Sequence, residues 1–527
     1  MRRIFPLLLI AFSATLVSAQ GFSSMQQRKL TNALSAISSL YVDSINDKKL
    51  VESTLETILK DLDPHSSYIP KEEVERVNEP LEGGFEGIGI QFQILDDTLL
   101  VVQTIAGCPA EKVGVQAGDR IIYINKDLVA GVKIQNSDVF KRLRGPKGSE
   151  VVIKIMRGNN PELLEFKIIR DKIPIYSVDA HYMINKEIGY IKINNFGNTT
   201  VQEFQKAFAD LKKKGMKNLV LSLQGNGGGY LNAAIGMADE FLGRNKLVVY
   251  TQGLNQPKSV AEATAAGNFE TGKLIVLIDE YSASASEILS GAIQDWDRGI
   301  IIGRRSFGKG LVQRQFPLID GSMMRLTVAR YYTPSGRCIQ KSYKGGYEKY
   351  EMDLVERYKH GEFLHADSIH LPDSLKYQTL NLKRTVYGGG GIMPDIFVPF
   401  DTASYTPAHR KLVAMGIVNK VSTQYILKHR DEMKKKFPVF DKFKNNYQPD
   451  DEFLGMLLTA ADKDKIKIDS AQFEKSKPLL KLQLKALVAR DLWEMSEYYQ
   501  IMDADNESLQ KAINILQTPG AYEKILK

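Results

Sequence analysis

The sequence predicts a multidomain α/β protein with helical regions at both ends. Strand-like and helix-like segments alternate between residues 185 and 340, which is typical of a layered core with a mainly parallel sheet. Short β-like runs separated by turns fill residues 82–172, and helical periodicity dominates residues 25–80 and the chain after about residue 405. A chain of 527 residues is too long for one compact domain, so we expect three or four.

The composition limits the classes of protein to which the chain can belong. Hydrophobic residues make up 43% of the chain, enough for several buried cores, and the formal net charge of +8 comes from scattered lysines. A nucleic-acid-binding protein would carry a denser basic patch, so we expect no nucleic-acid partner. The two cysteines, Cys108 and Cys338, lie far apart and make no zinc pattern. We expect two free thiols and no metal or cofactor, with a single disulfide as the alternative.

The N-terminus has the pattern of a secretory signal peptide. Arg2 and Arg3 precede an apolar run over residues 4–17, which ends in the small residues Ser18 and Ala19. The run is short for a membrane span, although an uncleaved anchor is the alternative. We therefore expect a signal peptide over residues 1–19, cleavage near Ala19, and a periplasmic or otherwise exported mature protein.

Residues 20–80 are expected to form an N-terminal helical region. Apolar residues recur at helical spacing and share a face, as in Leu30, Leu34, Ile37 and Leu40. The region closes with residues 62–68, LDPHSSY, a turn rich in helix-breaking residues. A helical arm or docking domain is the natural interpretation.

Residues 82–172 resemble a PDZ domain of the circularly arranged type found in bacterial proteases. The resemblance rests on the run GDRIIYIN at residues 118–125 and on the glycine-rich entry into the first strand. The backbone of Gly87, Ile88, Gly89 and Ile90 is the candidate loop for a peptide carboxylate, with the peptide adding as a strand at the sheet edge. The alternative is that these glycines only make tight turns.

Residues 173–400 are expected to form the α/β core, with residues 341–385 as a polar, partly irregular insertion and residues 401–527 as a C-terminal helical domain. The expected core elements are strands at 188–193, 219–223, 247–251, 274–278, 299–302 and 311–318, and helices at 200–214, 230–242 and from 285 onward. In the C-terminal region the expected helices are 412–421, 425–436, 453–461 and 471–499.

The candidate chemistry lies between residues 279 and 313. Ser282, Ser284 and Ser286 stand at a corner between an apolar strand and a helix, where free backbone N–H groups can hold a developing oxyanion. A serine nucleophile needs a base, and no histidine occurs between residues 182 and 359. Lys309 lies in a glycine-flanked loop beside apolar residues. Burial among these residues would lower the pKa of Lys309 and favour its neutral form, so a serine–lysine pair is predicted.

Supporting groups are predicted around this pair. Gln313, four residues after Lys309, can hydrogen-bond the amine and orient it. An oxyanion hole needs two donors: the backbone of Ala285 offers one, and the glycine turn at 227–229, with Gly228 and Gly229, offers the other because backbone without side chains approaches a substrate closely.

The chain resembles the C-terminal processing (tail-specific) peptidases, the S41 family of serine proteases. The resemblance covers roughly residues 25–400 and is carried by SASASE at 282–287, FGKGLVQ at 307–313, LDPHSSY, QGNGGGYL at 224–231, RYYTPSGRCIQ at 330–340 and GIMPDIFVP at 391–399. It implies a core with a ClpP/crotonase-like fold and a PDZ domain that gates the site. It also implies that Ser284 is the nucleophile, Lys309 the general base and Gln313 the orienting partner, with Ser282 and Ser286 as structural neighbours.

The sequence departs from the family pattern below the glycine turn. The family has an aspartate and an arginine where this chain has Ser222 and Gln224, which removes an ion pair. A phosphate-binding loop is a rival reading of residues 303–309, which fit GxxxxGK. It fails because Gly310 replaces the required Ser or Thr, and because an alternating strand-like run follows instead of a helix. Alanines flank Ser284, so an esterase elbow is not supported either.

These observations predict an exported serine endopeptidase that uses a Ser-Lys dyad and recognises proteins by their apolar C-terminal tails, with PDZ-gated activity. The expected partners are protein or peptide substrates with apolar C-termini; an adaptor protein and a homo-oligomer stay open. The alternative is a catalytically inactive, PDZ-bearing exported scaffold, because a serine before a helix is often only a cap and a lysine often only a surface charge.

Overall fold

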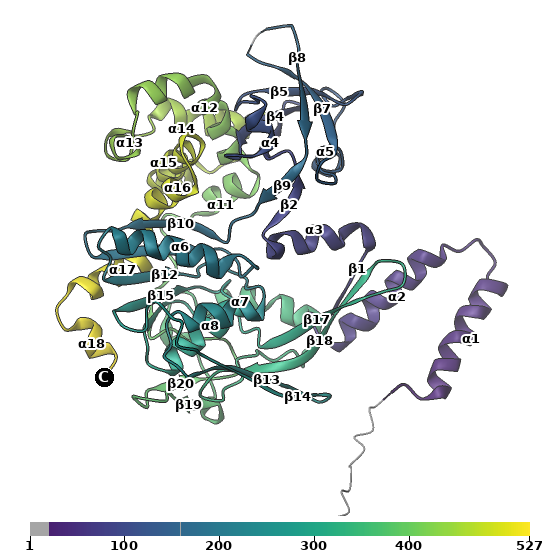
Figure 1. Cartoon of the computed structure of the whole chain (residues 1–527), viewed down its shortest axis with the longest axis vertical. Helices are drawn as coiled ribbons and strands as arrows, with labels where there is room; N and C mark the ends of the chain where they lie inside the picture. The colour runs from purple at the N-terminus through teal and green to yellow at the C-terminus, as the bar shows by residue number, and fades with distance from the viewer. Residues whose placement is uncertain (1–20, 159) are drawn as a thin grey trace, which may run out of the picture.

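The computed structural model describes residues 21–158 and 160–527 (Figure 1). The predicted signal peptide at residues 1–19 lies outside the described residues. Helices α1 (Ser24–Leu40) and α2 (Asp47–Leu62) form an arm, with α1 standing away from the rest of the molecule and burying none of its residues. Strand β1 (Ser67–Ile69) and helix α3 (Lys71–Glu82) then lead into the body. In the described part of the chain, no helix is long and apolar enough to cross a membrane.

The PDZ region is an antiparallel sheet with two short helices. Its strands are ordered β3-β4-β5-β7-β8, so β3 lies at an edge of the sheet. The elements of this region are β2 (Gly84–Gly87), β3 (Ile90–Leu95), β4 (Thr98–Thr104), α4 (Pro109–Lys112), β5 (Arg120–Ile124), β6 (Asp127–Leu128), α5 (Asn136–Leu143), β7 (Glu150–Met156), β8 (Leu164–Ile169) and β9 (Asp171–Pro174). The pair β2–β9 forms a separate antiparallel ribbon that joins this region to the core.

A six-stranded sheet forms the centre of the core, as the alternation of strands and helices predicted. Its order is β10-β11-β12-β15-β16-β21, and every pair except β10–β11 is parallel. The strands are β10 (Val178–Met183), β11 (Ile188–Ile193), β12 (Asn218–Ser222), β15 (Leu274–Ile278), β16 (Ile300–Gly303) and β21 (Ile396–Phe397). The central strand β15 is apolar and buried along its whole length because helices cover both faces of the sheet.

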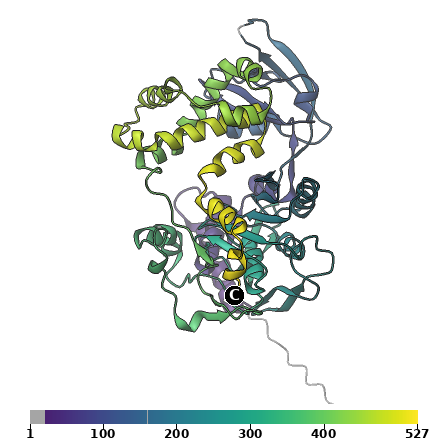
Figure 2. The same cartoon turned by 90° about the vertical axis from the view of Figure 1, so that its left-hand side faces the viewer.

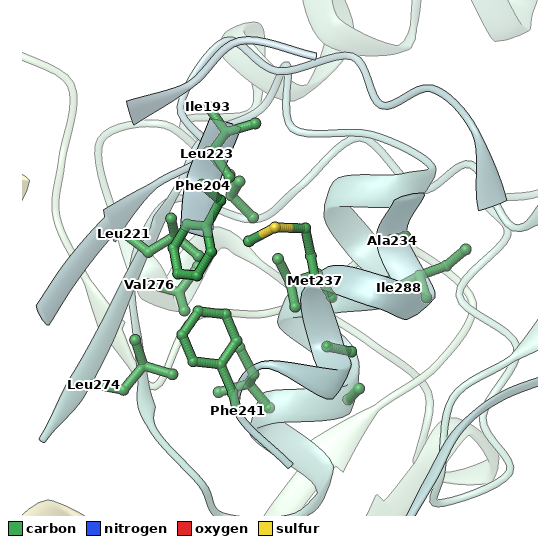
Figure 3. Close-up of a cluster of buried hydrophobic side chains, with 14 of the residues drawn as sticks. Ile193, Phe204, Leu221, Leu223, Ala234, Met237, Phe241, Leu274, Val276 and Ile288 are labelled. Carbon is green, nitrogen blue, oxygen red and sulfur yellow. The ribbon is translucent and has the colours of Figure 1, made fainter. Parts of the chain in front are cut away.

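Three helices cover one face of this sheet: α6 (Thr200–Lys213), α7 (Leu231–Asp239) and α8 (Ala285–Asp295). Figure 3 shows their contact with the strands, where Phe204, Met237 and Phe241 meet Leu221 and Val276. The opposite face receives α17 (Glu507–Gln517) and α18 (Ala521–Ile525), which bring apolar side chains against the alternate residues of the same strands. The end of the chain therefore packs on the core sheet and not only on the other C-terminal helices.

A second, antiparallel sheet was not predicted. It runs in the order β1-β18-β13-β14, with β17 paired to β18, and combines β13 (Leu247–Gly253), β14 (Gln256–Glu262), β17 (Leu311–Pro317) and β18 (Met323–Tyr332) with the short β1. Two of its strands carry mostly exposed or half-buried residues, so they lack the apolar signal of a buried strand. Pairing between strands so distant in sequence depends on the tertiary fold.

The predicted insertion at 341–385 contains α9 (Tyr347–Glu351), α10 (Asp353–Lys359), two short 3₁₀ turns and the strand β19 (Lys376–Gln378), which pairs with β20 (Thr385–Tyr387). The C-terminal helices are α11 (Pro407–Ala414), α12 (Ile417–Lys436), α13 (Phe440–Asn446), α14 (Asp451–Lys463), α15 (Ser470–Leu492) and α16 (Met495–Met502). Figures 1 and 2 show α11–α16 beside the PDZ region and above the core, and Gln103 of β4 donates a hydrogen bond to the carbonyl of Trp493 at 3.3 Å.

Several boundaries of the C-terminal helices differ from the prediction. The expected break between residues 421 and 425 is absent, and α12 runs through it. The break lies earlier, at Gly416, whose φ of 70° suits glycine and ends the preceding helix. The expected helix over 471–499 is divided at Trp493, since α15 ends at Leu492 and α16 begins at Met495. Apolar periodicity continued through both positions, so it could not reveal these breaks.

Candidate active site

Ser284 occupies a strained corner at the start of α8. Its φ and ψ are 54° and −111°, a conformation that residues other than glycine rarely adopt and that costs roughly 1–3 kcal/mol. The neighbouring serines have other roles: the Ser282 hydroxyl donates to the carbonyl of Leu223 at 2.8 Å, and the Ser286 hydroxyl donates to that of Asn226 at 2.9 Å. Both are fully buried, whereas Ser284 lines a cavity. Of the three serines, Ser284 alone is placed to meet a substrate.

The glycine turn lies directly against this corner. A side chain on Gly228 would come within 2.6 Å of the carbonyl of Ala283 and 2.8 Å of the Cβ of Ser284, so only glycine fits. The N–H of Gly228 donates to Oδ1 of Asn226 at 2.8 Å and is therefore already engaged. Within the described part of the chain, the N–H groups of Ala285 and Gly229 have no hydrogen-bond acceptor. Beside Ser284, Ala285 and Gly229 therefore keep N–H groups that no described residue engages, whereas Gly228 contributes close approach.

Lys309 lies in the loop between β16 and β17, and backbone contacts hold this loop against the serine corner. The N–H of Lys309 donates to Oε2 of Glu287 at 2.9 Å. The hydroxyl of Tyr331, on β18, lies within hydrogen-bonding distance of the carbonyls of both Ser284 and Lys309, and donates to one of them at a time. Tyr331 therefore bridges the two halves of the site.

The Lys309 amine contacts the side chain of Gln313, four residues further along the chain. Nζ of Lys309 donates to Oε1 of Gln313 at 3.3 Å, and the amide nitrogen of Gln313 donates to the carbonyl of His65. Burial lowers the pKa of Lys309, and the guanidinium of Arg325 lowers it further, while the carboxylates of Glu287 and Asp63 act in the opposite direction. The surroundings therefore favour the neutral amine that a general base requires.

Glu287 is a central residue of the site to which we assigned no role from the sequence. Its carboxylate is fully buried and accepts four hydrogen bonds: Oε2 from the N–H groups of Ser284 and Lys309, and Oε1 from the Ser306 hydroxyl and the N–H of Gly308. Burial raises the pKa of Glu287 to about 7, although these hydrogen bonds favour its charged form. The only signal in the sequence was its position three residues after Ser284, where a capping acid is common.

These groups surround one cavity of about 480 Å³. It is lined by the glycine turn, Ser284, Lys309, Gln313, Arg325 and Tyr331, among others. In the described part of the chain, no hydrogen bond joins the Ser284 hydroxyl to the Lys309 amine, and Arg325 has no ion-pair partner. The nucleophile and the candidate base thus face the same space without a direct contact.

Below the glycine turn, side chains from other parts of the chain hold Gln224. The buried Lys192 donates to the carbonyl of Gln224 at 2.7 Å, and the side-chain amide of Asn506, next to α17, donates to Oε1 of Gln224 at 2.9 Å. On the other side of the turn, both carboxylate oxygens of Asp279 accept the N–H of Gly225 at 3.0 Å. The turn is therefore anchored by residues from three distant segments.

The PDZ region presents the loop that the sequence predicted at residues 87–90. The loop joins β2 to the edge strand β3; Ile88 is buried, and its carbonyl accepts the N–H of Ala110 at 2.8 Å. Phe140 of α5 packs edge-on against Phe92 of β3 at 5.4 Å, which places α5 beside the open edge. An edge strand next to a helix and a glycine loop is the arrangement that accepts an added peptide strand.

Groups for metal or thiol chemistry are not assembled near this site. Among the residues that the structure describes, no cluster of His, Cys, Asp or Glu could hold a metal ion. Cys108 and Cys338 are both free thiols, Cys108 buried and Cys338 half-buried. The strand at Leu311–Pro317 follows Lys309 directly, so the helix that a phosphate-binding loop requires is replaced by β17.

Comparison with known proteins identifies two of these regions. The profile of peptidase family S41 matches residues 187–348, and the PDZ domain profile matches residues 87–168. A third profile, a family of unknown function called DUF8443, matches residues 408–494 in the C-terminal helices.

Curated relatives agree with this result. The chain is 38% identical over 305 residues to a carboxy-terminal-processing protease of Bartonella bacilliformis, covering 57% of this chain and 69% of the relative. It is 35% identical over 316 residues to the carboxy-terminal processing protease CtpB of Bacillus subtilis, covering 59% of this chain and 65% of the relative. A solved structure of the photosystem II D1 C-terminal processing protease is 26% identical, covers 60% of this chain and 90% of its own length, and superposes with a TM-score of 0.34.

The serine corner, the lysine loop, the glycine turn and the matched profiles lie on the same part of the chain. On the strength of the match to the Bartonella bacilliformis relative, the chain belongs to the C-terminal processing peptidases of family S41, and is a serine-type protease that carries a PDZ domain.

Proposed function

We propose that the chain is an exported endopeptidase that uses Ser284 and Lys309 as a catalytic dyad and selects proteins by their apolar C-terminal tails. The observation that carries the proposal is the shared cavity: Ser284, Lys309 and the glycine turn face one space of about 480 Å³. A scaffold without activity would have no need for a strained serine, a buried lysine and free backbone donors around one cavity.

In the proposed reaction, the Ser284 hydroxyl oxygen attacks the peptide carbonyl carbon while its proton passes to the neutral Lys309 amine. The N–H groups of Ala285 and Gly229 hold the oxyanion of the tetrahedral intermediate. The lysine ammonium then gives its proton to the leaving amine, and an ester on Ser284 remains. Water attacks this ester while one of its protons passes to Lys309. The lysine ammonium then returns that proton to the Ser284 oxygen as the ester C–O bond breaks, which restores the hydroxyl and releases the new carboxyl end of the substrate.

Lys309 is suited to the role of base for a geometric reason. A neutral amine has two N–H groups and one lone pair. One N–H donates to Oε1 of Gln313, and this contact fixes the amine at the cavity wall. The lone pair then remains for the Ser284 hydroxyl once a small movement closes the gap between them. We propose that substrate binding produces this movement.

A route for such coupling runs from the PDZ region to the cavity. Nη1 of Arg144, which follows α5, donates to both carboxylate oxygens of Glu79 at 2.6 and 2.7 Å, and its guanidinium lies over the rings of Phe85 and Phe140. Glu79 is on α3, and Leu81 of the same helix lines the catalytic cavity. A tail that displaces α5 or β2 would therefore act on the cavity wall through α3.

The proposed location and partners rest on the sequence. Arg2, Arg3 and the apolar run that follows favour export, with a periplasmic or other exported location after cleavage near Ala19. The partners are protein or peptide substrates; an adaptor protein and a homo-oligomer remain compatible with the exposed apolar residues of α1 and α2.

Cleavage of an unstructured protein by the wild type and by the Ser284→Ala and Lys309→Ala variants tests the dyad. We expect each substitution to lower kcat by about 10³-fold or more, since removing a member of such a unit removes most of the catalysis. The Ser282→Ala variant is the matched control, because the Ser282 hydroxyl is fully buried, donates to the carbonyl of Leu223 and does not line the cavity. Full activity of Ser284→Ala or Lys309→Ala would refute the dyad.

Tail recognition needs a separate test. Two charged residues added at the C-terminus of a good substrate should slow cleavage, and the same two residues inserted into an internal loop should not. Equal rates for the two substrates would count against capture by the PDZ region.

A further inference from the structure

The insertion at 341–385 is attached to the loop that carries the candidate base. Arg357 of α10 is buried, and its two terminal nitrogens donate to the carbonyls of Ser306 at 3.1 Å and Arg305 at 2.7 Å. The N–H of Lys341 donates to the carbonyl of Gly308 at 2.9 Å. The insertion therefore supports the lysine loop from the side away from the cavity, although most of it lies beyond the residues that match the S41 profile.

Tyr350 extends this contact to a second segment. It lies on α9, is buried, and its hydroxyl is 2.7 Å from Nε2 of His65 in the turn LDPHSSY. The two rings meet edge-to-face, with centroids 5.2 Å apart and planes at 88°. The side-chain amide of Gln340 donates to the same hydroxyl at 3.4 Å, which leaves the hydroxyl proton for His65.

The turn that carries His65 is itself tied to the second sheet. The carboxylate of Asp63 accepts the N–H groups of His65 and Ser66 at 2.8 and 2.9 Å, and also the Thr327 hydroxyl of β18 at 3.0 Å. Thr327 is the register partner of Gln313 across β17 and β18. The second sheet and the insertion thus together hold the turn next to Gln313.

The backbone carbonyl of His65 determines which way the Gln313 amide faces. A carbonyl only accepts hydrogen bonds, so the amide nitrogen of Gln313 must point toward it. The amide oxygen then points toward Lys309, whose Nζ donates to it at 3.3 Å. With the opposite orientation, an N–H of Gln313 would compete for the lone pair that the base needs.

We propose that Tyr350 and His65 are positioning residues of the proteolytic site, through which the 341–385 insertion orients Gln313 and hence the Lys309 amine. The inference rests on the proposed role of Lys309 as base. The path is continuous: Tyr350 hydroxyl to His65 ring, His65 carbonyl to Gln313 nitrogen, and Gln313 oxygen to Lys309 amine.

The charged groups around this path support a neutral His65. Burial lowers the pKa of His65 to about 4, with a further contribution from Lys309, so the ring is uncharged at neutral pH. Lys341 acts in the same direction as Lys309, whereas Asp63 opposes both. A neutral ring accepts a hydrogen bond from the Tyr350 hydroxyl at Nε2 and places no positive charge beside the base.

Steady-state kinetics of the full chain with the Tyr350→Phe variant tests the inference. This change removes only the hydroxyl, so the ring contact and the fold are retained. We expect kcat to fall about three- to tenfold with KM within twofold, because the loss of one hydrogen bond loosens the base and leaves the substrate groove unchanged. Tyr347→Phe, on the same helix but 37% exposed, is the matched control and should behave as wild type.

A double-mutant cycle separates positioning from general support of the fold. In a Gln313→Ala background, Tyr350→Phe should have no further effect on kcat, because the group through which it acts is gone. His65→Leu, which keeps the backbone carbonyl but removes the ring nitrogen, should lose as much as Tyr350→Phe, and the two together no more than either alone.

Three outcomes would overturn the inference: wild-type kcat in Tyr350→Phe, an equal loss in the presence and absence of Gln313, or additive losses for Tyr350 and His65. If Lys309→Ala were fully active, the proposed function itself would fail. Full activity of Tyr350→Phe together with an inactive Lys309→Ala would remove only the inference made here.

Discussion

The two halves of the catalytic site are held in place by different means. The serine half is built from neighbouring residues: the corner at Ser284 follows β15 directly, and the glycine turn that packs on it follows the adjacent strand β12. The lysine half is a loop whose position depends on side chains from elsewhere, among them Glu287, Tyr331 and Gln340. The proposed nucleophile is therefore positioned mainly by local backbone geometry, and the proposed base by long-range contacts.

This difference has a consequence for how the site responds to change. The largest damage to the serine half is expected from substitutions where the corner and the turn touch, because Gly228 has no space for a side chain there. The lysine half can be altered from distant positions, including the insertion and the turn at residues 62–68. Regulation is easier to build on the lysine half, because a movement far away can reach it without straining the backbone of the nucleophile.

The largest effect is expected from closing the space between the glycine turn and the corner. Gly228→Ala would place a methyl group 2.6 Å from the carbonyl of Ala283 and 2.9 Å from the N–H nitrogen of Ala285. The turn or the corner must then shift, so we expect a loss of about 10²-fold or more in kcat, as for a lost oxyanion donor. Gly225→Ala in the same turn has φ of 74° but open space, and serves as control. Similar losses for the two variants would contradict the steric argument.

The next largest effect is expected from replacing Glu287, whose carboxylate bonds to the backbone of both halves. In Glu287→Gln, an amide nitrogen replaces one oxygen and faces two donors: either the N–H groups of Ser284 and Lys309, or the Ser306 hydroxyl and the N–H of Gly308. Leaving buried donors unpaired costs about 1–3 kcal/mol, so we expect kcat to fall about 10- to 100-fold with a lower Tm. Ser290→Ala, buried on the same helix and bonded only within it, should retain activity.

The burial of Glu287 also predicts how stability changes with pH. Its pKa is raised from 4.5 to about 7 on folding, so the folded state binds more protons than the unfolded state between these values. The free energy of unfolding should therefore contain a part that is present below about pH 4.5 and is lost as the pH rises through 7. Denaturant titrations at a series of pH values give the free energy of unfolding as a function of pH. Between pH 4.5 and 7 this curve should fall more steeply for the wild type than for Glu287→Gln. Parallel curves for the two proteins would contradict the prediction.

A smaller change is expected when a positive charge near Lys309 is removed. Arg325→Gln removes a positive charge that lowers the pKa of Lys309, so this pKa should rise and the base should become neutral only at higher pH. The rising limb of kcat against pH should move to higher pH, with several-fold lower activity at pH 7 and little change at the alkaline plateau. Arg330→Gln, an exposed arginine of the same strand, is the control. An unmoved profile would exclude this electrostatic role.

The smallest effect is expected from removing one of the hydrogen bonds that hold the glycine turn from below. Asn506→Ser removes the hydrogen bond to Gln224 and keeps an oxygen that can cap α17. Because Lys192 and Asp279 still hold the turn, kcat should fall only about two- to threefold. Asn514→Ser, exposed on α17, is the matched control. A tenfold loss would mean that the C-terminal helices position the serine half more directly than the comparison of the two halves suggests.

Some parts of this molecule could be predicted from the sequence because their causes are local. Apolar runs at residues 188–193 and 274–278 indicated buried strands with the bounds that the structure has. The glycines at 227–229, the serine at a strand–helix corner and the lysine four residues before Gln313 were all visible as short patterns. Each depends on neighbouring residues, whose conformational preferences act wherever the chain folds.

Other features were decided by tertiary structure alone. Gln313 and His65 are 248 residues apart, and Tyr350 and His65 are separated by 285; no pattern of spacing relates them. The positive φ of Ser284 was also not visible, since a serine rarely adopts it and no sequence pattern marks it. The sequence therefore determined which residues stand at the site. Long-range packing decided which groups hold them, namely the Glu287 carboxylate, the His65 carbonyl and the Tyr331 hydroxyl. Contacts of that kind form only when distant strands pair, so their partners are set by the whole fold.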